Sequence, residues 1–144
     1  MRTEAMTELK APRTTVVRKT DTTVFSRGNG VETTLLIGNQ VAGSNFTSGL
    51  TRFPPGMGAP LHYHNCDEQV TILEGQAEFQ VEDRIETLGV YDSTFIPAGK
   101  PHRFTNIGTS PLVIMWIYDA PVVTRTFAAT GQTVEHLSGG DLVK

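Results

Sequence analysis

The chain has 144 residues, a formal net charge of −3 and 38% hydrophobic residues. This length suits one domain with its own core, and the composition argues against a disordered chain or a membrane protein. Without a basic stripe, the sequence gives no reason to expect nucleic acid or an anionic membrane as a partner.

Two features of the chain favour a cytoplasmic protein. Residues 1–13 are polar and lack the apolar core of a secretory signal peptide. Cys66 is the single cysteine, so no disulfide can form within one chain, which suits a reducing compartment.

In chain order, the sequence consists of short β-branched or apolar segments separated by turn residues, and little of it has helical periodicity. Strands are expected at residues 14–18, 22–26, 31–37, 46–53, 61–64, 70–73, 77–81, 85–88, 93–96, 103–105 and 112–118. Turn signals recur about every 8–12 residues, which is typical of an antiparallel sandwich or barrel. A helical turn or two is expected only in the tail, at residues 133–137.

The same pattern divides the chain into three parts. Residues 1–12 are expected to be a flexible N-terminal segment, residues 13–130 a β-barrel domain, and residues 131–144 a C-terminal tail. The fold class predicted is therefore all-β, an antiparallel barrel with little helix.

Three of the four histidines lie in two segments that such a barrel can bring together. His62 and His64 are two residues apart on an expected strand, so their side chains point to the same side. Glu68 follows four residues later, and His102 comes after Pro97-Ala98-Gly99. Three imidazoles and one carboxylate suit Fe(II), Mn(II), Ni(II), Zn(II), Co(II) or Cu(II), and four ligands leave open positions for chemistry. Ordinary hydrogen-bonded histidines are the alternative interpretation.

The spacing of these residues resembles the two motifs of the cupin family. Gly56, His62-Tyr63-His64, Glu68 and Gly75 fit every fixed position of the first motif, and Pro97-Ala98-Gly99, His102 and Asn106 fit the second. One position departs: the second motif should begin with glycine at residue 91, where this chain has Tyr91.

The resemblance implies a jelly-roll barrel with one divalent transition metal ion per chain, such as Fe(II), Mn(II), Zn(II) or Ni(II), held by His62, His64, Glu68 and His102. Asn106 is then expected to fix a turn or to lie next to the ligands. Cys66 lies within the ligand loop, where it is either a small buried residue or a soft ligand.

Strand parity and residue type suggest further site residues. The expected lining of a mostly apolar cavity is Phe46, Phe53, Val70, Ile72, Phe79, Phe104, Trp116 and Tyr118. Arg52 is a candidate anchor for a substrate carboxylate, and His136, in the polar tail, is expected to be exposed. No phosphate-binding loop is present, so a nucleotide cofactor is not expected.

The family resemblance leaves three functions open. The first, which we expect, is a metal-dependent oxygenase acting on an apolar or aromatic small molecule. The second is a non-redox metalloenzyme, an isomerase, lyase or polyketide cyclase that uses the metal as a Lewis acid. The third is a small-molecule binding module without catalysis. A homodimer is also expected, because residues 112–118 are apolar on both faces and open strand edges would remain in a monomer.

Overall fold

The computed structural model describes residues 8–143, which form two antiparallel sheets of six strands each. The first sheet runs in the order β1 (Val24–Ser26), β2 (Glu32–Ile37), β3 (Thr47–Phe53), β10 (Leu112–Tyr118), β5 (Glu68–Glu74) and β8 (Ser93–Ile96). The second runs β12 (Thr133–Glu135), β11 (Thr124–Phe127), β4 (His62–His64), β9 (His102–Asn106), β6 (Ala77–Val81) and β7 (Arg84–Leu88). The helical elements are a 3-10 turn, η2 (Lys19–Asp21), and one short helix, α1 (Asn39–Ala42).

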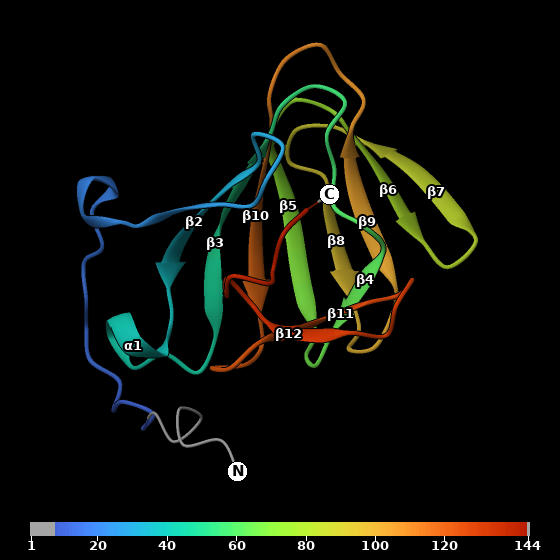
Figure 1. Ribbon diagram of the computed structural model, residues 1–144. Helices are drawn as coiled ribbons and strands as arrows, with labels where there is room; N and C mark the ends of the chain where they lie inside the picture. Colours follow the sequence, from blue (N-terminus) through green and yellow to red (C-terminus); the bar gives the residue numbers. More distant parts are fainter. Residues whose placement is uncertain (1–7, 144) are drawn as a thin grey trace.

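The two sheets enclose a barrel-shaped core (Figure 1). β10 lies in the middle of the first sheet between β3 and β5, and its even-numbered residues are buried while the odd-numbered ones are partly exposed. This alternation follows from the period of two of a β-strand. The prediction of an all-β antiparallel barrel with little helix is thus confirmed.

Two local predictions are wrong. Residues 14–18 form no strand, because β-branched side chains give only a propensity and this exposed stretch has no neighbouring strand to pair with. Residues 133–137 form no helical turn, because β12 pairs with β11 instead. Beyond β12, Asp141 and Val143 are at most 2% exposed.

The expected flexible segment, residues 1–12, lies partly outside the described residues, which begin at residue 8. Within it, the Lys10 amide donates to the side chain of Asn39 in α1, and the adjoining Arg13 amide donates to Ala42. No helix within residues 8–143 is long and apolar enough to cross a membrane. The homodimer stays a prediction.

Tyr91, at the motif position where glycine is expected, has a left-handed backbone with φ of 71°. Its amide donates to the carbonyl of Ile72 at 2.7 Å, which fixes the turn against β5. The side chain is 79% exposed, so it gains little from packing. The turn therefore requires the conformation that glycine adopts without steric cost, even though the chain has a tyrosine.

Replacing Tyr91 by glycine should relieve this strain. We expect Tyr91→Gly to unfold at a melting temperature about 2–4 °C above that of Tyr91→Ala, since a left-handed non-glycine residue costs about 1 kcal/mol. The alanine variant is the matched control, because it removes the same exposed side chain and keeps the strain. Equal melting temperatures would show that the turn is not strained.

Candidate metal centre

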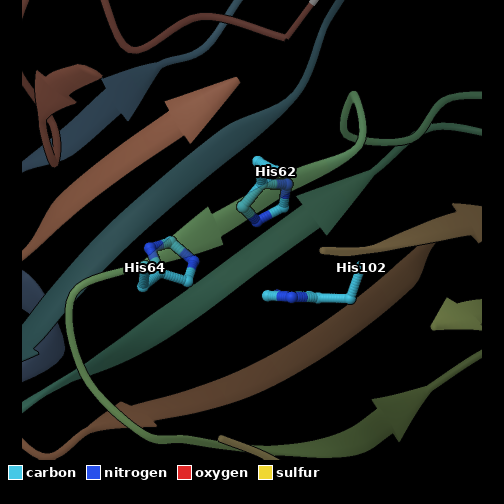
Figure 2. A group of neighbouring side chains, drawn as sticks. All are labelled: His62, His64 and His102. Carbon is cyan, nitrogen blue, oxygen red and sulfur yellow. The ribbon is translucent and has the colours of Figure 1, made fainter. Parts of the chain in front are cut away.

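The three motif histidines meet inside the barrel because two neighbouring strands of one sheet carry them. On β4, His62 and His64 are buried and the intervening Tyr63 is only partly so. His62 lies opposite His102 in the register of β4 and β9, which places the two side chains on the same face. One ring nitrogen from each histidine lies within 4.8 Å of the others, and Figure 2 shows the rings gathered around one common space.

A backbone carbonyl sets the orientation of each ring. The Nδ1 atoms lie 2.6 Å from the carbonyl oxygen of Pro60 for His62, 3.0 Å from that of Thr124 for His64, and 2.8 Å from that of Lys100 for His102. A carbonyl can only accept, so each Nδ1 carries the proton and donates it. In the neutral rings the Nε2 lone pairs are then free, as is usual for histidines that bind a metal.

Glu68, the first residue of β5, brings a carboxylate to the same place from the other sheet. Its Oε1 lies 3.0 Å from His102 Nε2 and 3.7 Å from His64 Nε2, and the residue is 5% exposed. Burial alone would raise the pKa of Glu68, but the contact with His102 and the nearby His64 and Arg125 lower it overall, so the carboxylate is ionised at neutral pH.

The contact between Glu68 and His102 needs a positive charge between the two atoms. His102 donates through Nδ1, so in its neutral form Nε2 is an acceptor facing a second acceptor at 3.0 Å. A proton on Nε2 or a metal ion removes this conflict. Adjacent ligands on an octahedral ion with bonds of about 2.1 Å lie about 3 Å apart, so the spacing fits a transition metal.

Burial keeps two of the rings neutral. It lowers the pKa of His62 well below 6.5 and that of His64 to about 4, and the positive charge of Arg125 acts in the same direction on both. A neutral imidazole is the form that binds a metal, so protons compete weakly for these two ligands at neutral pH.

Hydrogen bonds between the two motif loops hold the ligands in place. The Ala98 amide donates to the Asp67 carboxylate at 2.9 Å, and the Gly99 amide donates to the His64 carbonyl at 3.0 Å. The loop that precedes His102 is therefore tied directly to the loop that carries the other ligands.

Beside the histidines lies a small cavity of about 30 Å³, enough for one or two water molecules. Of the residues expected to line it, Phe53, Phe104, Trp116 and Tyr118 do so. Val70, Ile72 and Phe79 are buried in the surrounding core, and Phe46 is 45% exposed in the segment before β3. The complete lining is Arg27, Thr51, Phe53, Ala59, His62, Glu68, His102, Phe104, Ile114, Trp116, Tyr118, Arg125, His136 and Val143.

Two further polar side chains at this cavity have roles that the sequence did not indicate. The Tyr118 hydroxyl lies 3.3 Å from His64 Nε2, and burial raises the pKa of Tyr118 well above 10, so the phenol keeps its proton. The expectation that His136 is exposed is wrong: the residue is partly buried and its ring lies 5.1 Å from that of Tyr118. β12 and the residues after it carry His136 to the cavity, and the strand pattern of this short, polar segment was too weak to show that.

Neither Cys66 nor Asn106 belongs to the three-histidine cluster. Burial and the neighbouring carboxylates raise the pKa of Cys66 to about 12, so its thiol is protonated at neutral pH and a poor metal ligand. The Asn106 amide donates to the carbonyls of Phe53 and Ser110 and accepts from the Gly108 amide, which fixes a turn.

The neutral state of His64 makes the stability of the metal-free protein depend on pH. The folded pKa of about 4 lies below the ordinary 6.5, so the contribution of His64 is complete above pH 6.5 and is lost as the pH falls toward 4. In denaturant unfolding of chelator-treated protein, His64 should contribute about 2 kcal/mol less to the free energy of unfolding at pH 5 than at pH 7.

The variant His64→Gln isolates the contribution of His64 to this pH dependence of stability. The variant should show a smaller loss between pH 7 and pH 5 than the wild type, whatever its absolute stability. An identical loss in both proteins would mean that His64 titrates normally in the folded state.

The chain resembles known proteins in sequence and in fold. The cupin domain family model matches residues 49–118. Dimethylsulfoniopropionate lyase DddQ of Ruegeria pomeroyi is 33% identical over 93 residues, which cover 60% of this chain and 46% of that protein. The chain thus spans about half the length of this curated relative.

Two solved structures share the fold at low sequence identity. An RmlC-like cupin from Shewanella frigidimarina has a TM-score of 0.66 at 18% identity, covering 78% of this chain and 95% of its own. The polyketide cyclase RemF from Streptomyces resistomycificus has a TM-score of 0.66 at 21% identity, covering 83% and 89%. Together, the family match, the barrel and both histidine motifs show that this chain belongs to the cupin superfamily.

Proposed function

We propose that this protein is a metal-dependent enzyme that acts on a small molecule by non-redox chemistry, as a lyase, isomerase or cyclase. The ligands would be His62, His64, Glu68 and His102, with one divalent transition metal ion per chain. When bound, the ion would act as a Lewis acid that polarises a substrate oxygen.

The main support for a bound metal ion is the contact between Glu68 and His102. Two acceptor atoms lie 3.0 Å apart inside the barrel, and His62 and His64 each bring a ring nitrogen to the same space, where His64 Nε2 also lies 3.3 Å from the Tyr118 hydroxyl. Without a cation this cluster brings together groups of the same polarity in a buried site, which costs free energy. A divalent ion satisfies all of them at once.

The Tyr118 hydroxyl favours non-redox chemistry. It contacts the cluster at His64 and keeps its proton at neutral pH, so it can donate a hydrogen bond to a developing negative charge on a substrate. Burial lowers the pKa of His136 well below 6.5, so its neutral ring lies 5.1 Å from that of Tyr118 without adding a positive charge. Eliminations, isomerisations and cyclisations all develop negative charge that such a donor stabilises.

The similar proteins support the same class. The relative at 33% identity is a lyase, and one protein with the same fold is a polyketide cyclase. The oxygenase that the sequence favoured uses the same ligand types, so the ligand set alone does not separate the two. The positioned hydrogen-bond donor, the Tyr118 hydroxyl, is the observation that moves the preference to the non-redox alternative.

Metal ligation is tested first with Glu68→Gln. The amide nitrogen of glutamine can donate to His102 Nε2, so the metal-free variant should be at least as stable as the metal-free wild type. Its affinity for Zn(II) or Mn(II), measured by calorimetry, should fall at least about tenfold. Glu74→Gln, the same change at the exposed end of β5, is the matched control and should bind as the wild type does.

Two histidine variants complete this test. His62→Ala and His102→Ala should lose stoichiometric metal, by elemental analysis, and keep a β-rich circular dichroism spectrum. Full metal content in either histidine variant, or wild-type metal affinity in Glu68→Gln, would refute the ligand assignment.

Non-redox turnover is tested with Tyr118→Phe and with oxygen. Dimethylsulfoniopropionate is the first compound to try, with substrate loss followed by NMR. Turnover by the metal-loaded wild type should be equal in air and under nitrogen, and Tyr118→Phe should lower it about a hundredfold or more at unchanged metal content. Oxygen uptake coupled to substrate loss would instead favour the oxygenase.

A further inference from the structure

A second buried cluster of charges lies at the cavity, next to the histidines. Arg27 Nη2 lies 2.8 Å and Arg125 Nε 3.1 Å from the same oxygen, Oδ1 of Asp141. All three residues are at most 5% exposed, and both arginines line the cavity together with His62 and Glu68. No motif in the sequence pointed to this cluster.

Arg125 reaches the cavity because of strand register. It lies opposite His64 where β11 pairs with β4, so the two side chains share the inner face of the sheet. The side chain of Asn65 fixes this pairing, since it accepts from the Thr124 amide at 2.9 Å and donates to the Val122 carbonyl at 3.0 Å. Arg125 is thus held next to the candidate metal centre. Arg52, the cation first considered for this role, is exposed on β3.

The two arginines differ in how their donors are used. Arg27 donates to the Asp141 carbonyl through Nε and to the Thr33 hydroxyl through Nη1, and its Nη2 contacts the Asp141 carboxylate outside hydrogen-bond geometry. Among residues 8–143, Arg125 Nη1 is buried and has no hydrogen-bond partner, and Arg125 Nε contacts Asp141 outside hydrogen-bond geometry. An unpaired guanidinium donor in a buried site is costly and calls for an acceptor.

The charges at this cavity point to the kind of acceptor. Two guanidinium groups, Arg27 and Arg125, face two carboxylates, Glu68 and Asp141. A divalent ion at the histidines would leave this buried region with two excess positive charges. A small anion from outside the chain is the ligand that offsets this excess, and a carboxylate also matches the planar fork of arginine.

We propose that Arg125 binds the carboxylate of the substrate, so that the substrate is a small carboxylic acid held between Arg125 and the metal centre. Arg27 holds Asp141 beside Arg125, and the Asp141 carboxylate competes with the substrate for the Arg125 guanidinium. This inference rests on the proposed function for the role of the bound acid, but the anion site itself depends only on Arg125. The cavity, of about 30 Å³, has room for a small polar group next to Arg125.

The test uses acetate as the probe and acetamide, its neutral counterpart of nearly equal shape, as the control. Binding of each compound is titrated by NMR against both metal-free and metal-loaded protein. The wild type should bind acetate in both forms, with acetamide at least about tenfold weaker. Arg125→Gln should lose at least about tenfold in acetate affinity at unchanged metal content, Arg125→Lys should keep part of it, and Arg84→Gln on exposed β7 should change nothing.

Asp141→Asn tests whether Arg125 binds the anion directly. If Arg125 had only a structural role, acetate affinity would not change in this variant. This change removes the internal carboxylate that competes for Arg125, while the asparagine oxygen can still accept from the Leu137 amide. Acetate affinity should therefore rise in this variant.

The possible outcomes separate the two proposals. If acetate binds only when metal is present and Arg125→Gln has no effect, the carboxylate site is refuted while the metal enzyme stands. If the protein takes up no metal but acetate binding still depends on Arg125, the proposed function fails and the anion site is supported. Equal affinities for acetate and acetamide in every form would overturn the inference.

Discussion

Three backbone carbonyls determine what the centre of this barrel can do. Those of Pro60, Lys100 and Thr124 each accept the Nδ1 proton of one histidine. Each ring therefore turns its Nε2 lone pair toward one common space. An imidazole without such a partner can rotate or change tautomer, and the lone pairs would no longer converge. The convergence of the three rings follows from this constraint, and β5 adds Glu68 from the other sheet.

Around that centre, the electrostatics of the cavity come from segments far apart in the chain. Arg27 follows β1, Arg125 lies on β11, and Asp141 lies beyond β12. Figure 1 shows this last segment returning to the barrel near β10 and β11, and the Val143 amide donates to the Arg27 carbonyl at 2.7 Å. The cavity is thus closed by the same residues that supply its charges. Its lining is mixed, with apolar rings on one part and two guanidinium groups on another.

This mixed lining favours some reactions and substrates over others. A set of three histidines and a glutamate suits many metals and both redox and non-redox reactions. A protonated phenol next to the ligands and an arginine with a free donor are more specific features. They suit the proposed chemistry, in which an anionic substrate would gain or lose a proton while a bound ion would stabilise negative charge.

The sequence by itself determined the class of fold and the members of the histidine cluster. Strand periodicity and turn signals depend only on residues that are close together in the sequence. The local pattern alone was therefore enough to place β10 and most other strands. His62, His64, Glu68 and His102 were found because family spacing encodes which residues meet. Tyr91 stands where the family motif has glycine. The backbone there adopts the left-handed conformation that the motif predicts, although the residue is a tyrosine.

The tertiary structure decided which other residues reach the cavity. Arg125, His136 and Asp141 lie in segments whose local pattern is weak, and β12 forms as a strand because β11 lies beside it. Phe46 has the right residue type for the lining, but it lies outside the barrel because the chain turns before β3 begins. Contacts of this kind depend on strand pairing across long sequence separations. Pairing of that range is fixed by the packing of the whole barrel, and no short window of residues contains it.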